Sequence, residues 1–293
     1  MPFTPATTVL GIGTMGLGMA HSLLRAGIPT TVWNRHAAKA APLADDGATV
    51  AETLEDAVGN ADVVITMLFD VDAVAAVMAE AIPLLKPGAV WIQASTVGRT
   101  GIDRLAAMAE GPGIAFYDAP VVGTKQPAED GKLTVLAAGP AATREIAQPV
   151  LDAIGAKTVW LGDSPGPASA MKLVANSWVA TITAGTAFGI EQAKAFGLDP
   201  AQFLETVSGG AADSPYLQAK GRTIIEDRTG DPQFALDGLR KDLALIRAAD
   251  LEAGVPTTLV DALLESYGTA SQRGHGGADI SAVAAAFSAD HGE

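Results

Sequence analysis

A glycine run near the start of the chain has the residue types and spacing of a site for dinucleotide phosphates. It follows a β-branched run and opens a segment with helical periodicity. Glycines permit a tight turn and a close approach of backbone to ligand, and the following helix points its free N–H groups at a pyrophosphate. The run therefore predicts dinucleotide binding by Gly11, Ile12, Gly13, Thr14, Met15 and Gly16.

The end of the second predicted strand carries the residues that select the dinucleotide. In folds of this type an Asp or Glu at this point binds the ribose diol, and it repels a 2′-phosphate. This chain has Asn34 and Arg35 instead. A guanidinium fits a phosphate with two parallel hydrogen bonds, so we expect the cofactor to be NADP(H).

A lysine and an asparagine share one face of an otherwise apolar helical segment. Lys172 and Asn176 are four residues apart, so their polar ends lie on the same side of a helix. When hydride reaches a carbonyl carbon, negative charge grows on the oxygen, and an ammonium beside an amide can stabilise it and supply the proton. Spacing alone equally allows a lysine that reaches out to solvent and an asparagine bonded within the core.

Three other features carry less information by themselves. The segment from Asp118 to Lys125 ends a predicted strand, at the edge where open α/β sheets bind ligands, but it also fits an ordinary loop. Lys241 and Asp242 fit an exposed ion pair. The histidines have no spacing that suggests a metal site, and we expect no catalytic role for His21, His36, His275 or His291.

Alternating patterns in the first half predict a parallel sheet built from βαβ units. The predicted strands are 7–12, 30–34, 63–68, 89–94, 114–118, 133–137 and 158–161, and the predicted helices are 15–26, 37–45, 71–81, 100–109 and 142–154. From Ala168 onward the pattern is helical throughout. The glycines and prolines of 162–167 suit a connector, so we place a dinucleotide-binding domain at 1–163 and a helical domain at 164–293.

Composition narrows the class of protein. The 293 residues are 48% hydrophobic and 18% charged, which is typical of a globular chain. The formal net charge of -14 disfavours nucleic acid and anionic lipid as partners. Without cysteine there is no thiolate catalysis and no cysteine-ligated metal. The first eight residues lack the pattern of a signal peptide, so we expect a cytoplasmic location.

One segment has the apolar character of a membrane span. Leu173 to Ile190 contains no charged side chain, but it includes several Thr, Ser and Gly residues and has no basic flanking cluster. We expect a buried helix of a soluble protein and no membrane partner. A two-domain monomer would not cover the whole circumference of such a helix, so we also expect a homodimer.

Taken together, these residues resemble the β-hydroxyacid dehydrogenase family almost end to end. The stretch from Gly11 to Ala20 is similar to the family's cofactor fingerprint. Gly123 to Gly131 resembles the glyoxylate and succinic semialdehyde reductase branch in particular. The resemblance implies an N-terminal Rossmann domain with a doubly wound sheet, a long interdomain helix, an all-α C-terminal domain, and dimers or tetramers.

The resemblance also implies roles for residues that spacing left open. Lys172 and Asn176 are similar to the family's catalytic pair, and Asn34-Arg35 to its NADP-selecting strand end. Further cofactor contacts are implied for Met67, Leu68, Thr96 and Lys241, and substrate contacts for Val122, Gly123, Thr124 and Phe234.

Two positions depart from the family pattern. Val122 stands where the family usually has a serine that contributes to a substrate carboxylate site, and Ala168 replaces the second glycine of a Gly-x-Gly run before the lysine. Losing one hydroxyl donor weakens carboxylate binding by about 1–3 kcal/mol unless backbone N–H groups of Gly123 and Thr124 compensate.

The resulting expectation is an NADPH-dependent reductase of small aldehydes or 2-oxo acids with Lys172 as the proton donor. The alternatives on the same scaffold are an imine reductase, which the apolar Val122 favours, and a dehydrogenase of the 3-hydroxyisobutyrate type. A dinucleotide-binding sensor without catalysis is the alternative from another class of protein.

Overall fold

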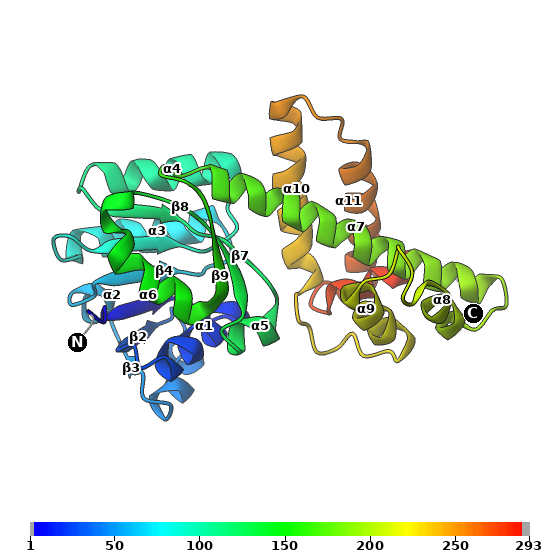
Figure 1. Cartoon of the computed structure of the whole chain (residues 1–293), viewed down its shortest axis with the longest axis horizontal. Coiled ribbons are helices and arrows are strands. Elements are labelled where there is room, and N and C mark those ends of the chain that lie inside the picture. The colour runs from blue at the N-terminus through cyan, green and yellow to red at the C-terminus, as the bar shows by residue number, and fades with distance from the viewer. Residues whose placement is uncertain (1–2, 289–293) are drawn as a thin grey trace. The chain divides into compact units, whose positions relative to one another are not determined.

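The computed structural model describes residues 3–288 and divides into two compact units, the first ending at Lys172 and the second beginning at Leu173 (Figure 1). The boundary expected from the connector at 162–167 lies several residues earlier. The connector is followed at once by helix α7 (Pro167–Ala195), whose first turns pack on the first unit before the helix continues into the second.

A nine-stranded sheet forms the centre of the first unit, in the order β3-β2-β1-β4-β5-β6-β8-β7, with β9 beside β8. The pairs from β3 to β6 are parallel, as expected. β8 runs antiparallel to β6 and β7, so the sheet is mixed at this edge and not parallel throughout. The strands are β1 (Thr7–Leu10), β2 (Thr30–Trp33), β3 (Thr49–Val50), β4 (Val63–Thr66), β5 (Val90–Gln93), β6 (Ala115–Asp118), β7 (Val121–Val122), β8 (Leu133–Ala138) and β9 (Gly155–Gly162).

Helices cover both faces of this sheet because its central strands are apolar on both sides. Val9 and Ile65 belong to the core under α1 and α6, whereas their neighbours Leu10 and Val64 belong to the core under α2, α3 and α4. The predicted helix at 37–45 is instead two short 3₁₀ segments, with Pro42 near the start of the second. The helices are α1 (Thr14–Arg25), α2 (Leu54–Val58), α3 (Val71–Ala81), α4 (Gly98–Glu110), α5 (Lys125–Glu129) and α6 (Arg144–Ile154).

In the described part of the second unit the regular elements are helices, with one isolated bridge between Ala235 and Asp279. Its core collects Leu239, Leu243 and Ile246 from α10, and Leu263 and Tyr267 from α11, which lies beside α10 (Figure 1). The doubly wound α/β unit, the long helix and the helical remainder confirm the expected fold class. Besides α7 the helices are α8 (Pro200–Val207), α9 (Pro215–Ile225), α10 (Leu236–Ala253) and α11 (Thr258–Ala270).

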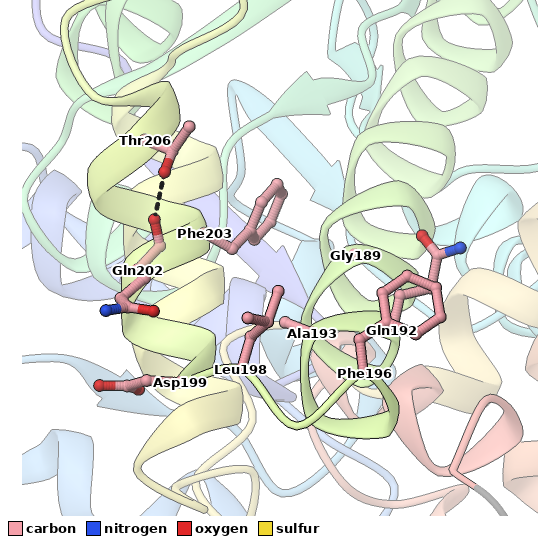
Figure 2. Close-up of a pocket in the computed structure, with 9 residues that line it drawn as sticks. All are labelled: Gly189, Gln192, Ala193, Phe196, Leu198, Asp199, Gln202, Phe203 and Thr206. Carbon is pink, nitrogen blue, oxygen red and sulfur yellow. Dashed lines mark hydrogen bonds between the residues drawn. The ribbon is translucent and has the colours of Figure 1, made fainter.

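The end of α7 and helix α8 line an open, mostly apolar hollow of about 380 Å³. Phe203 of α8 packs so closely on Gly189 that a Cβ there would lie 2.9 Å from its ring. Figure 2 shows Phe196 and Leu198 on the connection between these helices. None of the predicted site residues lines the hollow, and along a straight helix Gly189 is about 25 Å from Lys172.

Candidate active site

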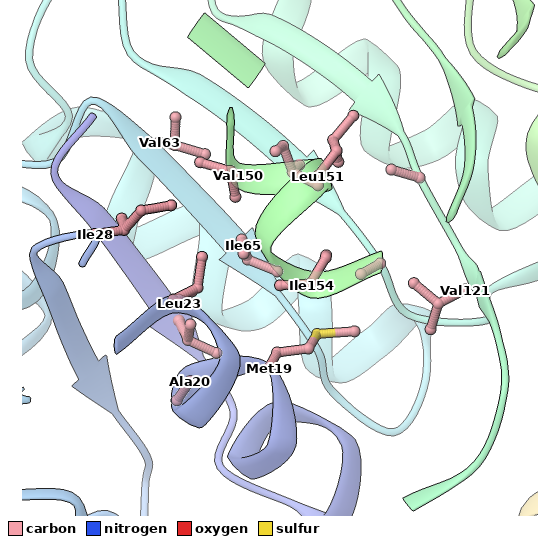
Figure 3. Packing of buried hydrophobic residues seen from close by; sticks show 14 of the residues in the cluster. Met19, Ala20, Leu23, Ile28, Val63, Ile65, Val121, Val150, Leu151 and Ile154 are labelled. Atoms are coloured by element: carbon pink, nitrogen blue, oxygen red, sulfur yellow. The ribbon is translucent and has the colours of Figure 1, made fainter. Parts of the chain in front are cut away.

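The glycine run lies at the carboxyl end of β1 and begins α1. Figure 3 shows how α1 is fixed there: Met19, Ala20 and Leu23 belong to one buried apolar cluster with the strand residues Val63 and Ile65. At two positions the turn has room for nothing larger than glycine. Gly11 has φ +105°, and a Cβ on it would lie 2.3 Å from the Met67 carbonyl oxygen, while a Cβ on Gly16 would lie 1.9 Å from the Gly11 carbonyl oxygen. Close packing of the turn on itself therefore fixes where α1 begins.

The N-terminus of α1 fits a phosphate. Its N-cap residue is Gly13, which provides no side-chain cap for the first N–H groups of the helix. No atom of the chain approaches within 4 Å of a Cβ built on Gly13, so this side of the turn is open. Thr14 is exposed beside it, and Met15 packs on the core. Unsatisfied N–H groups at an open helix N-terminus are a suitable cradle for the pyrophosphate of a dinucleotide.

The two glycines give a matched test of this cradle. We expect Gly16→Ala to lower the melting temperature, because its Cβ would collide with backbone at Gly11. We expect Gly13→Ala to leave the melting temperature within about 1 °C, because the added methyl group meets no atom of the chain. We expect it to weaken NADPH binding about tenfold, because the methyl group would crowd the bound dinucleotide. Thermal unfolding and a fluorescence titration with NADPH measure both effects. Undiminished NADPH affinity in Gly13→Ala would argue against phosphate binding at this turn.

Asn34 and Arg35 have different roles at the end of β2. The Asn34 side chain braces the glycine turn: its Oδ1 accepts a hydrogen bond from Ile12 N at 3.0 Å, and its Nδ2 donates to His36 O at 3.0 Å. Arg35 is exposed, and it forms no ion pair with any residue in the range 3–288. Its guanidinium is thus available to an anionic ligand beside the turn.

The ends of β4 and β5 meet beside the glycine turn. Met67 N donates to Leu10 O at 2.9 Å, which ties the end of β4 to that of β1. Leu68 N donates to Ser95 Oγ at 2.8 Å, which ties it to the segment after β5, where the half-buried Thr96 follows. The structure therefore brings the predicted cofactor contacts of the first unit to one edge of the sheet.

The loop that carries Val122, Gly123 and Thr124 lies on an apolar cluster. Val122 packs on the buried residues Leu136, Ala138 and Ala168. The two departures from the family pattern, at 122 and 168, thus belong to the same cluster. Gly123 has φ +140° and is exposed, and Thr124 is the N-cap residue of α5.

Lys172 and Asn176 lie one turn apart on α7, as predicted, and both are buried. Their exposed fractions are 8% and 2%. The Asn176 Nδ2 donates a hydrogen bond of 2.6 Å to Asp242 Oδ2. This bond leaves the Asn176 carbonyl oxygen as an acceptor of fixed direction.

Asp242 is the main residue that sequence reasoning missed, since Lys241-Asp242 fitted an exposed pair. Its side chain is buried, and its Oδ1 lies 2.9 Å from Lys241 Nζ. A signal was available: Asp242 has the helical spacing of the apolar residues Leu239 and Ile246, so it falls on the buried face of α10. The structure joins Asn176, Asp242 and Lys241 into one hydrogen-bonded and ionic group.

Phe234 is held by a second buried carboxylate that the sequence did not indicate. Asp279 Oδ2 accepts hydrogen bonds from Gln233 N at 3.0 Å and Phe234 N at 3.4 Å, and Ile280 N donates to Phe234 O. Both Asp279 oxygens also accept hydrogen bonds from Lys220 Nζ, at 2.6 and 2.8 Å. The half-buried Phe234 is thereby fixed before α10 begins.

Residues 3–288 contain no group of three or more His, Cys, Asp or Glu that could hold a metal ion. His21 is close to Asp46 at the surface, with Nδ1 and Oδ2 3.5 Å apart. His291 lies outside the described residues.

Comparisons with known proteins show which families the chain matches. Residues 6–162 match the family described as the NAD binding domain of 6-phosphogluconate dehydrogenase. Residues 166–287 match the family described as NAD-binding of NADP-dependent 3-hydroxyisobutyrate dehydrogenase. The chain is 35% identical over 283 residues to glyoxylate/succinic semialdehyde reductase 2, chloroplastic, of Arabidopsis thaliana, covering 96% of this chain and 78% of that protein.

Two solved structures share the fold over almost the whole chain. A 3-hydroxyisobutyrate dehydrogenase from Salmonella typhimurium has a TM-score of 0.88 at 27% identity, covering 96% of this chain and 99% of that one. An imine reductase from Myxococcus stipitatus in complex with NADP+ has a TM-score of 0.64 at 26% identity, covering 95% and 98%.

Proposed function

The chain belongs to the β-hydroxyacid dehydrogenase family, and from this premise we propose that it is an NADPH-dependent reductase of small aldehydes and 2-oxo acids, of the glyoxylate and succinic semialdehyde type. The family and its relatives make it an NAD(P)-dependent oxidoreductase, as the resemblance implied. The observation that carries the finer proposal is the buried Lys172, one turn from an asparagine amide that a buried carboxylate orients.

In the proposed reaction the dinucleotide, when bound at the glycine turn, supplies the hydride that reduces the carbonyl carbon. Lys172 Nζ donates a proton to the carbonyl oxygen as negative charge develops there, which gives the hydroxyl product. The resulting amine regains its proton from solvent. Asn176 orients the substrate or the lysine, because Asp242 holds its amide in one direction. Lys241 forms an ion pair with Asp242 and completes this group.

Cofactor preference is proposed from Arg35. We expect Arg35→Ser to raise the KM for NADPH at least about tenfold, because a charge-assisted bidentate contact is lost, and to leave the KM for NADH within about twofold. Steady-state kinetics with both cofactors measure this. Arg104→Ser removes another exposed arginine, which pairs with Asp72 on another helix, and it serves as the control. An unchanged preference in Arg35→Ser would place the 2′-phosphate elsewhere.

The substrate class is tested by NADPH consumption with glyoxylate, succinic semialdehyde, butanal as the uncharged aldehyde of matched length, and a cyclic imine. The 35% identical reductase supports the carboxylate-bearing aldehydes. Higher kcat/KM for glyoxylate or succinic semialdehyde than for butanal is the expected result. Preference for butanal would mean that carboxylate binding is lost because Val122 replaces the serine of the family pattern.

Imine reduction is the second candidate, favoured by the apolar packing of Val122 and by the likeness to an imine reductase. Lys172 argues against it, since an ammonium about 4 Å from an iminium costs about 1–4 kcal/mol. Turnover of the cyclic imine above that of every carbonyl would establish this reading. Oxidation of a 3-hydroxyisobutyrate-type hydroxyacid is the same chemistry reversed, and NADP+ with that substrate tests it.

A homodimer is proposed from α7. This is the one helix in residues 3–288 that is long and apolar enough to cross a membrane by length and composition, and 44% of its apolar window is buried. Met171, Val174, Trp178 and Phe188 remain exposed along it. A stripe of this size favours a second copy of the chain as its cover.

We expect a dimer in light scattering at micromolar concentration and a monomer for Trp178→Glu. Leu84→Glu is the control. A monomeric wild type would exclude this proposal.

A further inference from the structure

Asp118 ends β6 with a fully buried carboxylate that accepts hydrogen bonds from the first turn of α7 and from the residue just before that helix. Its Oδ2 accepts from Gly166 N at 2.9 Å and from Ser169 N at 2.8 Å, and its Oδ1 accepts from Ser169 Oγ at 2.7 Å. The N–H groups of a helix's first turn lack partners within the helix. Here a side chain from the sheet, 48 and 51 residues away in sequence, takes the place of a local N-cap.

The same turn is fixed by packing. Pro167 opens α7, and the buried Ala168 belongs to the apolar cluster with Leu136 and Ala138 of β8. Asp118 itself pairs with Ala138 in the sheet. Burial raises the pKa of Asp118, and the hydrogen bonds from Ser169 and Gly166 oppose that rise. A desolvated carboxylate is retained at this position, where an apolar contact alone would leave the N–H groups of the turn unsatisfied.

We propose that Asp118 is a positioning residue for Lys172: by capping α7 from the end of β6, it fixes the helical turn that aims the Lys172 ammonium. The inference rests on the proposed function for the role of Lys172. Lys172 follows Ser169 by three residues, so it lies on the same side of the helix about 4.5 Å further along. A displacement of about 1 Å at a proton donor can cost about a hundredfold in rate, so a rigid start of α7 has a kinetic consequence.

The kinetic test uses Asp118→Ala and the isosteric Asp118→Asn, each also combined with Lys172→Ala. We expect Asp118→Ala to lower kcat about tenfold or more with KM and the NADPH Kd within about twofold, and to lower it no further when Lys172 is already alanine. Asp118→Asn should recover most of the rate, because its oxygen can accept both N–H groups and its amide can donate to Ser169 Oγ. Ser169→Ala removes one bond and remains usable if Asp118→Ala does not fold.

The matched control is Asp199→Ala, which removes the side-chain cap of α8 from Ala201 N and should leave kcat unchanged. A loss of rate that adds to that of Lys172→Ala, or a change confined to KM or to NADPH binding, overturns the positioning role. So does unchanged kcat in both Asp118→Ala and Ser169→Ala.

A second readout separates this inference from the proposed function, because it needs no turnover. The rate at which a small amine-directed acylating reagent modifies Lys172, mapped by mass spectrometry, reports how often the start of α7 opens. We expect about a fivefold faster reaction in Asp118→Ala, the scale of a lost helix cap, with Lys220, another buried lysine, unchanged. If the wild type reduces no carbonyl but this rate rises, the proposed function fails and the capping of α7 by Asp118 stands. If the rate does not rise, a role of Asp118 in fixing the start of α7 is excluded.

Discussion

Lys172→Ala should lower kcat for carbonyl reduction at least about a hundredfold while the NADPH Kd stays within about twofold. A positioned general acid contributes about 10²–10⁴ in rate, and a hundredfold loss corresponds to about 2.7 kcal/mol of transition-state stabilisation. The proposed cofactor contacts do not include Lys172, so we expect the effect to fall on turnover and not on dinucleotide binding. Stopped-flow hydride transfer with glyoxylate, together with an NADPH titration, measures the two separately.

Lys194→Ala is the matched control for this experiment. Lys194 lies on the same helix, is exposed, and pairs with Glu191 at 2.7 Å, so its loss should leave kcat unchanged. Retention of most of the turnover by correctly folded Lys172→Ala would remove Lys172 from the role of proton donor. The scaffold would then have to supply the proton from another group or from water.

The residues predicted from the sequence are those whose signal is local. Gly11, Gly13 and Gly16 form a turn whose spacing is itself the requirement, and the structure has them at the end of β1 with no room for a Cβ at two of the three. Lys172 and Asn176 share a helix face by arithmetic alone. The α/β fold class, the helical second half and the membership of the family were likewise readable from periodicity and motif order, and they are confirmed.

The contacts that hold these residues in place were not readable, because their partners are distant in sequence. Asp242 bonds Asn176 across 66 positions, and Asp118 bonds Ser169 across 51. Sequence spacing does not indicate pairs that are so far apart, and an isolated acidic residue is expected to be exposed to solvent. The antiparallel direction of β8 has the same origin, since alternation predicts a strand but not the neighbour with which it pairs.

Asp279 is the carboxylate whose removal should destabilise the second unit most. Its side chain is 1% exposed, forms two hydrogen bonds with Lys220, and accepts further bonds from Ser281 N and Oγ. Removing one member of a buried pair leaves the other charge uncompensated and costs about 3–5 kcal/mol. Because Asp279 also holds Phe234 N, the loss should reach the candidate site as a raised KM for the carbonyl substrate.

We therefore expect Asp279→Ala to lose about 3–5 kcal/mol in the free energy of opening of the α10 amides, measured by hydrogen exchange near pH 7. Burial acts to raise the pKa of Asp279, but the charge and hydrogen bonds of Lys220 and the bonds from Ser281 hold it below its ordinary value of 3.8. A carboxyl group with a lowered folded-state pKa adds stability that is complete above its unfolded value and is lost as the pH falls through the folded one. The difference between wild type and variant should thus shrink only under strongly acidic conditions.

Asp261→Ala, which breaks the exposed pair with Arg247, is the control and should leave these amides unchanged. Equal protection of the α10 amides in Asp279→Ala and wild type would show that the buried pair does not stabilise this unit.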